Sequence, residues 1–402
     1  MYKAILKNKD IKPKISNSTN FIEYDWPEIK ILSVEYENQC GITIFSYINP
    51  IDPVKRLSYY ISKRGKDIGG FVTDIIERSP IETYKTNGIH TIVLVGGSTL
   101  GLEAICGVQN RILKDNVQWY NNLPEEKRIS MKYLPLHERV IGACCYTTNL
   151  SIDKNYIYPD RELGTFGMTE IFKIRNRESI TNKIYLKQSG VGLNSKVAKI
   201  NAPNSDDNNW MENCKSAGIG AHFYHNLESG FKILVFINLN SLGVVHDNFK
   251  LLHNFNKYAK GTNINNEEIS KLLNSFSNNV EGRNTLDNGS PSNTTLSVII
   301  TNMIIHTENK ELISEELHQE IENMIMPYGT SGDGDILFVC STDEIEYNKD
   351  ILLIEGKSCI RNSIKKVFDI DLIGGKYDYK EKYQKYKSKY FNLKKNNFIN
   401  IL

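Results

Sequence analysis

The sequence predicts an α+β protein built as a layered sandwich, and three observations support that prediction. Apolar runs rich in β-branched residues predict strands at 231–245, 294–301 and 335–342. The segment that starts at His90, HTIVLVGGSTLGLEAICGVQNRIL, has a buried-strand pattern, a Gly-Gly turn and then helical spacing. Residues 311–326 carry apolar side chains at helical spacing. Because these elements do not alternate in a strict β-α-β rhythm, a layered α+β sandwich is favoured over a doubly wound parallel sheet.

The spacing of apolar and polar residues predicts each of these elements. The helix after the Gly-Gly turn places three apolar residues on one face: Ile105, Val108 and Ile112. The run FKILVFINLNSLGVV predicts a strand, a polar turn at Asn240 and Ser241, and a second strand. The helix at 311–326 has an apolar face of four residues: Ile313, Leu317, Ile321 and Met324.

Size and charge limit the classes of protein. A chain of 402 residues can form one large domain or two modest ones, with a substantial core in either case. Apolar residues make up 40% and charged residues 24%, as in ordinary globular proteins. The formal net charge is only +2, whereas phosphate binding normally requires a concentrated basic surface. We therefore expect no nucleic-acid partner for the body of the protein.

Cysteine and histidine patterns indicate neither disulfides nor a metal. The seven cysteines are an odd number without C-x-x-C spacing, which predicts reduced thiols in a cytoplasmic protein. The eight histidines form no H-x-x-x-H or H-E-x-x-H group, so we expect no metal and no cofactor. The N-terminal MYKAILKNKDIKPK lacks the apolar core of a signal peptide, and no window approaches 18 uninterrupted apolar residues. We expect a protein that is neither secreted nor transmembrane.

Two polar segments, near 200–210 and at 260–292, are poor core material and predict surface insertions. The C-terminal segment 374–402 is rich in lysine and tyrosine, and its spacing predicts an amphipathic helix or a short coiled coil, with docking to an acidic partner or a membrane surface as the alternative. This tail resembles the Lys/Tyr-repeat tails of giant DNA virus proteins, which implies a host cytoplasm or virion location but no activity. Its stripe consists of Tyr379, Tyr383, Tyr386, Tyr390 and Leu393.

The junction DNGSPSNTTLSVIITN places two threonines where a polar loop meets a buried strand. A threonine within a chain is a poor nucleophile, but an N-terminal threonine carries its own base. Its α-amino group, with an ordinary pKa of about 7.7–8.0, can accept the hydroxyl proton near neutral pH. Attack of the Thr294 hydroxyl on the Asn293 carbonyl would cut the chain and create that terminus. Two threonines also suit the start of an ordinary strand.

Six other segments accompany this junction, in order, between about His90 and Glu346: LVGGSTLGLEAICGV, VIGACCY, YPDRELG, GVGLNSKVAK, INLNSLGVV and GDGDILF. Together with NTTLSVIITN they resemble the autoprocessing family of L-aminopeptidase/D-amidases and nylon-oligomer (aminohexanoate-oligomer) endohydrolases. They are most similar to the nylon-oligomer hydrolase branch. The resemblance implies a four-layered α/β/β/α sandwich of the self-cleaving aminopeptidase and ornithine acetyltransferase type.

The resemblance also implies the residues that perform the chemistry. Thr294 is the nucleophile, and Asp333 and Asp335 orient and tune its amine and hydroxyl. Lys199 stabilises the developing oxyanion, with Lys196 as the alternative if the register differs by one turn.

Other implied roles concern the oxyanion and the substrate. Asn240 donates its amide N–H to the oxyanion, and Tyr146 hydrogen-bonds the substrate or the nucleophile. The turn at Gly96, Gly97 and Ser98 lacks the Gly-Lys-Ser/Thr ending of a phosphate loop, which favours a packing role or a substrate cradle. Relatives commonly have His-Thr before the Asp-Gly-Asp and Thr after it, where this chain has Gly329-Thr330 and Ile336, which alters the substrate side of the expected site.

The sequence thus predicts a self-cleaving N-terminal-threonine amidohydrolase or peptidase that acts on small peptide or aminohexanoate-type amides. Residues 1–293 would form the α chain and 294–355 the catalytic part of the β chain, followed by the tail at 374–402. The resemblance implies a homo-oligomer, a tetramer. Two alternatives stay open: an acyltransferase of the ornithine acetyltransferase type, and a catalytically inactive structural or virion protein that keeps the fold.

Overall fold

The computed structural model describes residues 11–37, 39–48, 55–65, 88–130, 140–145, 147, 157–175, 182–199, 214–255, 258–265, 267–268, 270–271, 294–329 and 334–369. The chain divides into two units, residues 1–369 and residues 370–402. The second unit, with the Lys/Tyr-rich tail, lies outside the described residues, as does the insertion predicted near 200–210.

The first of two five-stranded sheets has the strand order β1-β3-β4-β6-β7. Its strands pair antiparallel except for β6 and β7, which are parallel. Helix α5 packs on β3 and β4, and helix α3 packs on β7 and on α5. The bounds are β1 (Lys14–Ile15), β3 (Ile29–Tyr36), β4 (Cys40–Tyr47), β6 (Thr91–Val95), β7 (Val140–Cys144), the 3-10 turn η1 (Ser98–Leu102), α3 (Glu103–Asn121), α4 (Glu125–Ser130) and α5 (Arg161–Arg175).

Two glycines of the motif segments let α3 and α5 approach closely. A Cβ at Gly107 would lie 2.1 Å from the Arg161 carbonyl oxygen, and a Cβ at Gly164 would lie 1.9 Å from the Ala104 oxygen. Since no side chain fits at either distance, both positions require glycine. The apolar face predicted for this helix, Ile105, Val108 and Ile112, is buried, as expected.

The second sheet has the order β11-β12-β15-β17-β5, with β15 and β17 parallel and the other pairs antiparallel. Helix α8 packs on β11 and β12, while α7 packs on β5 and β17. The bounds are β5 (Ser58–Gly65), β11 (Gly218–His225), β12 (Lys232–Leu239), β15 (Leu296–Met303), β17 (Gly334–Ile345), α7 (Thr307–Glu322) and α8 (Lys349–Val367). These elements confirm the strands predicted near 231–245, 294–301 and 335–342.

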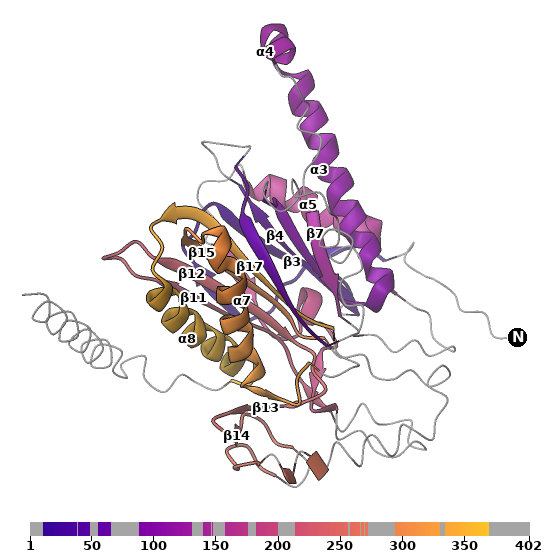
Figure 1. The fold of residues 1–402 in the computed structure, drawn as a ribbon. Coiled ribbons are helices and arrows are strands. Elements are labelled where there is room, and N and C mark those ends of the chain that lie inside the picture. The colour runs from indigo at the N-terminus through magenta and orange to yellow at the C-terminus, as the bar shows by residue number, and fades with distance from the viewer. Residues whose placement is uncertain are drawn as a thin grey trace, which may run out of the picture. The chain divides into compact units, whose positions relative to one another are not determined.

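A hydrophobic core joins the two sheets face to face. It takes alternate residues from both, including Phe45 and Ile92 from the first sheet and Phe236, Val298 and Phe338 from the second. The rings of Phe45 and Phe236 meet edge to face with their centroids 4.9 Å apart. Helices cover the outer face of each sheet, so the layers follow the order α/β/β/α (Figure 1). The predicted four-layered α+β architecture is therefore confirmed.

Some elements differ from the prediction. The helix expected at 311–326 ends at Glu322, and Ile325–Met326 form the short strand β16, which pairs with β13 (Val244–Asp247). Helix α8 was not predicted. Shorter pairs complete the described structure: β2 (Phe21–Tyr24) with β8 (Asn182–Tyr185), β9 (Lys196–Val197) with β10 (Lys215–Ser216), and β13 with β14 (Lys250–Leu251).

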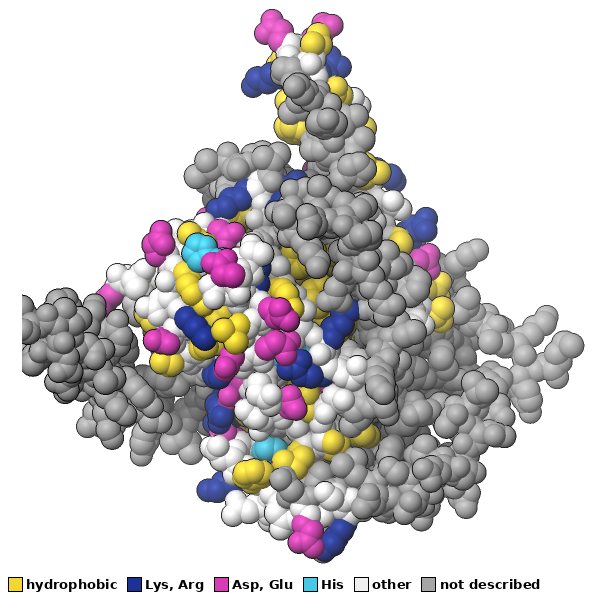
Figure 2. Space-filling model, viewed as in Figure 1, with side chains coloured by type: hydrophobic (Ala, Val, Ile, Leu, Met, Phe, Trp, Pro, Cys, Tyr) yellow, Lys and Arg dark blue, Asp and Glu magenta, His cyan; other side chains and the backbone are white. Residues whose placement is uncertain are grey.

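The outer face of α7 and α8 carries acidic and basic side chains that alternate (Figure 2). Lys357 of α8 pairs with Glu316 of α7 at 2.6 Å, and Arg361 of α8 pairs with Asp247 of β13 at 2.7 Å. Among the described residues, no helix is both long enough and apolar enough to cross a membrane.

The contact between the sheets predicts a large stability effect at Phe236, which is 0% exposed. Phe236→Ala should lower the free energy of unfolding by about 3–5 kcal/mol, because it leaves a cavity opposite Phe45. Chemical denaturation measures the change. Leu227→Ala is the control, since Leu227 is 84% exposed and should change stability by no more than about 0.5 kcal/mol. Equal effects of the two substitutions would contradict the described sandwich.

Candidate active site

Thr294 is buried where the chain enters β15. It is 3% exposed and precedes β15 by two residues, and its backbone N–H donates to the Asn240 carbonyl oxygen at 3.1 Å. In β15, Leu296 and Val298 face the core between the sheets. Because side chains alternate along a strand, the same register places Thr294 on the inter-sheet face and Thr295 on the helix face.

Asn240 and Lys199 meet beside this threonine. The Lys199 Nζ donates to the Asn240 carbonyl oxygen at 3.1 Å and to its side-chain Oδ1 at 3.0 Å. Lys199 is 4% exposed and Asn240 is 1% exposed, so the ammonium is a buried charge that needs such acceptors. Lys196 reaches the same Oδ1 through its backbone N–H at 3.1 Å. Of the two candidate lysines, it is thus Lys199 whose ammonium contacts Asn240.

The turn before Lys199 has an unusual backbone. Ala198 has a φ of 60°, in the left-handed region that non-glycine residues rarely adopt. Its N–H donates to the Gly243 carbonyl at 2.8 Å, which fixes the turn against the loop that follows Asn240. This strained turn therefore holds Lys199 close to Asn240.

Asp335 holds the other side of the junction. Its Oδ1 accepts the Thr295 N–H at 2.5 Å, and its Oδ2 accepts the Gly329 N–H at 3.2 Å. Asp335 is 1% exposed. The Thr295 N–H belongs to the peptide group that follows Thr294, so the backbone on both sides of Thr294 is fixed by hydrogen bonds. Asp333, the other predicted carboxylate, lies outside the described residues, as do Asn293 and Tyr146.

The predicted substrate cradle begins at the end of β6. The Gly97 N–H donates to the Thr147 Oγ1 at 3.1 Å, and a Cβ at Gly97 would lie 2.5 Å from the Pro159 Cδ. A Cβ at Gly96 would lie 3.8 Å from the Val191 carbonyl oxygen. The Ser98 side chain is not described, although its backbone opens η1. The described contacts thus place Gly97 against Thr147 and Pro159, and Gly96 near Thr147 and Val191.

Asn238 and Cys145, which the sequence reasoning did not select, join the two regions. The Asn238 Nδ2 donates to the Cys145 Sγ at 3.4 Å and to the Val191 oxygen at 3.5 Å, and Asn238 pairs with Leu296 across the sheet. Burial raises the pKa of the Cys145 thiol, and the charge of Lys199 offsets part of that rise. The signal for Asn238 was its place two residues before Asn240, on the same strand face.

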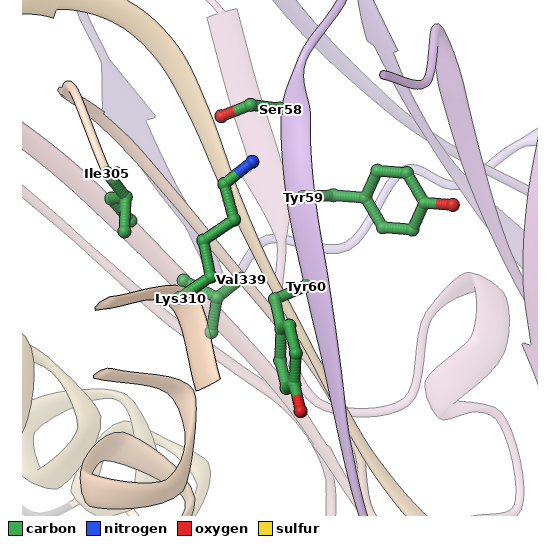
Figure 3. A pocket seen from close by; sticks show the side chains of 6 residues that line it. All are labelled: Ser58, Tyr59, Tyr60, Ile305, Lys310 and Val339. Carbon is green, nitrogen blue, oxygen red and sulfur yellow. The ribbon is translucent and has the colours of Figure 1, made fainter. Parts of the chain in front are cut away.

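Other features lie away from this site. Within the described ranges, no three His, Cys, Asp or Glu side chains form a group that could hold a metal ion. A small pocket beside the middle of β17 is lined by none of the site residues described above (Figure 3). It is lined by Ser58, Tyr59, Tyr60, Ile305, Lys310 and Val339.

Comparisons with known proteins find distant relatives. No family model matches the chain. The chain is 23% identical over 338 residues to a protein named 6-aminohexanoate-oligomer endohydrolase from Agromyces sp. (strain KY5R), covering 84% of this chain and 79% of that protein. A protein of the same name from Paenarthrobacter ureafaciens is 24% identical over 338 residues, with the same coverage. The predicted similarity to nylon-oligomer hydrolases is confirmed at this level, whereas the viral resemblance of the tail stays a prediction.

Two solved structures are similar at low identity. The L-aminopeptidase D-Ala-esterase/amidase from Ochrobactrum anthropi is 11% identical with a TM-score of 0.47, covering 91% of this chain and 85% of that one. A Burkholderia sp. beta-aminopeptidase is 9% identical with a TM-score of 0.46, covering 82% and 78%. At these TM-scores, the assignment of the architecture depends on the sheets and helices of this chain itself.

The two hydrogen bonds that Asp335 accepts predict a loss of stability when its carboxylate is replaced by an amide. Asp335→Asn replaces one accepting oxygen by an NH₂ group that faces a backbone N–H, and should lower the free energy of unfolding by about 1–3 kcal/mol. Asp343→Asn in the same strand is the control. Asp343 has a φ of 52°, which asparagine tolerates, so its change should stay within about 0.5 kcal/mol. Chemical denaturation measures the free energy of unfolding of both variants. An Asp335→Asn variant as stable as the wild type would contradict the described contacts.

Proposed function

We propose that this protein is a self-cleaving N-terminal-threonine amidohydrolase that acts on amide bonds of peptides or aminohexanoate-type oligomers. The observation that carries the proposal is the position of Thr294, buried at the start of β15 with the Lys199 ammonium bound to the carbonyl that accepts its N–H. The similarity to proteins named 6-aminohexanoate-oligomer endohydrolase supports amide hydrolysis as the reaction class.

Self-cleavage would proceed at the Asn293–Thr294 bond. The Thr294 Oγ1 attacks the Asn293 carbonyl carbon, the C–N bond breaks, and the nitrogen becomes the α-amino group of Thr294. Water then hydrolyses the resulting ester, which leaves a carboxylate on Asn293 and restores the hydroxyl. The products are chains 1–293 and 294–402.

The processed threonine would then attack substrate. Its α-amine accepts the hydroxyl proton and passes a proton to the departing amine, and water hydrolyses the acyl-enzyme ester. We assign the oxyanion to the Lys199 ammonium and the Asn240 amide, because both groups are buried beside Thr294. Asp335 fixes the following peptide through the Thr295 N–H, and we retain Asp333 as its partner.

The substrate side of the proposal depends on residues farther from Thr294. We assign substrate contacts to Gly96, Gly97, Ser98 and Tyr146. A small acyl-transfer acceptor other than water would turn the same intermediate into an acyltransferase reaction. Product analysis with a competing amine separates these outcomes, because transfer in excess of hydrolysis would favour the ornithine acetyltransferase type.

Cleavage at the threonine junction is tested with two isosteric substitutions. Thr294→Val should remain a single chain of 46.0 kDa, since valine keeps the β-branched shape but lacks the nucleophile. Thr295→Val should still give a fragment that begins at Thr294, because the Thr295 hydroxyl is buried without a hydrogen-bond partner among the described residues. Intact mass spectrometry with N-terminal sequencing measures both. Cleavage of Thr294→Val at the same bond, or a stable uncut wild-type chain, would refute the proposal.

The role of Lys199 is tested by a matched lysine pair. Lys199→Met should lower kcat/KM for hydrolysis by about 10²–10³-fold, the usual cost of removing one oxyanion donor. Lys196→Met keeps the backbone N–H that contacts Asn240 and should change kcat/KM little. The assay follows ninhydrin-reactive amine released from short peptides and aminohexanoate oligomers. Loss of activity in Lys196→Met with retention in Lys199→Met would reverse the assignment.

A further inference from the structure

A chain of hydrogen bonds, buried at its centre and partly buried at its two ends, lies beside Asp335 on the face of the second sheet that α7 covers. The Ser62 hydroxyl on β5 donates to the Glu315 Oε1 at 2.6 Å and contacts the His318 Nδ1 at 2.8 Å. The His318 Nε2 contacts the Tyr328 hydroxyl at 2.8 Å. His318 is 0% exposed and Ser62 is 2% exposed. We refer to these four residues, Tyr328, His318, Ser62 and Glu315, as the Tyr328 chain.

The donor and the acceptor of each hydrogen bond in the Tyr328 chain can be assigned. Burial would raise the pKa of Glu315, but hydrogen bonds from Arg64 and Ser62 and the charge of Arg64 lower it overall, so the carboxylate accepts the Ser62 proton. The Ser62 oxygen must then accept the His318 Nδ1–H. Burial, followed by the charge of Arg64, lowers the pKa of His318 to about 3, so the ring is neutral near pH 7. Its Nε2 therefore accepts the proton of Tyr328.

The Tyr328 chain ends one residue from an Asp335 contact. Gly329, which follows Tyr328, donates its N–H to the Asp335 Oδ2 at 3.2 Å. Gly329 has a φ of 64°, and a Cβ there would lie 3.0 Å from the Arg64 Cβ. Arg64 pairs across the strands with Asp335, but its guanidinium contacts Glu315 at 2.7 Å and Glu322 at 3.5 Å. The backbone of the turn, rather than the Arg64 side chain, thus supplies this donor to Asp335.

We propose that His318 and Tyr328 are positioning residues for Asp335, which hold the Gly329 N–H on its Oδ2 and thereby fix the Oδ1 on the peptide that follows Thr294. The proposal rests on the proposed function for its effect on cleavage and turnover. It gives α7 a part in the site through His318 and the turn at Gly329. A displaced turn would let the Asp335 carboxylate rotate, and small displacements in such a site reduce rates strongly.

The test compares hydroxyl deletions in the full chain. Tyr328→Phe removes the proton that the His318 Nε2 accepts, and should slow conversion of freshly translated precursor by at least about tenfold. In processed enzyme it should lower kcat with little change in KM. Tyr347→Phe is the matched control, because the Tyr347 hydroxyl is buried without a hydrogen-bond partner among the described residues. It should cleave at the wild-type rate.

Two substitutions of His318 keep the test decisive if the Tyr328→Phe variant folds poorly. His318→Gln keeps an N–H for Ser62 and an oxygen for Tyr328, so it should retain most of the cleavage rate. His318→Leu has neither group and should lose as much as Tyr328→Phe or more. Thermal melting of each uncut precursor, in a Thr294→Val background, reports folding separately. Equal cleavage rates in His318→Leu and His318→Gln would overturn the proposal.

Hydrogen–deuterium exchange of the peptide from Tyr328 to Ile336 separates this proposal from the proposed function. In the same Thr294→Val background, Tyr328→Phe should increase its exchange, whereas Tyr347→Phe should not. If the wild type cleaves and Tyr328→Phe cleaves equally fast, the positioning role is wrong while the function stands. If the wild-type chain never cleaves, the proposed function is wrong, and the positioning role is then judged from exchange alone. Faster exchange of this peptide in Tyr328→Phe supports the positioning of Asp335, and unchanged exchange refutes it.

Discussion

Hydrogen bonds from two consecutive peptide N–H groups fix the position of Thr294. The Thr294 N–H donates to the Asn240 carbonyl, and the Thr295 N–H donates to the Asp335 carboxylate. These two acceptors lie at the ends of the strands on either side of β15, since Asn240 directly follows β12 and Asp335 is the second residue of β17. A central strand with one antiparallel and one parallel neighbour therefore holds the junction from both sides. Sites supported in this way by sheet strands are held more rigidly than sites on loops.

The two faces of the second sheet contribute different contacts around that junction. Between the sheets lie Asn238, Cys145 and the region of Val191, which connect the start of β15 to the Gly-Gly turn. On the helix side, α7 contributes His318, whose bonds reach Tyr328 and so the turn that contacts Asp335. The strand register places the Thr294 side chain on the inter-sheet side, and the helix side supports Asp335.

The sequence predicted the architecture, and three of the residues that it selected as candidates lie together in the structure. Thr294, Lys199 and Asn240 lie together because their ordered segments mark three points of one fold, and the structure brings those points into contact. Local patterns could not predict the Gly329 contact with Asp335, since it depends on a left-handed turn and on packing against Arg64. The end of α7 at Glu322 was missed for a related reason: the apolar spacing continues to Met324, while Ile325 pairs with β13.

The arrangement around Asn240 has a consequence for the proposed reaction. The Thr294 nitrogen and the Lys199 Nζ each lie 3.1 Å from the same carbonyl oxygen. In the proposed cleaved form that nitrogen would be an amine, and a nearby ammonium disfavours a second positive charge. The uncharged amine is the form that can accept the hydroxyl proton. Lys199 would thus act twice, first by stabilising the oxyanion and then by favouring the unprotonated form of the new terminus, and the same carbonyl that positions the precursor would position the mature nucleophile.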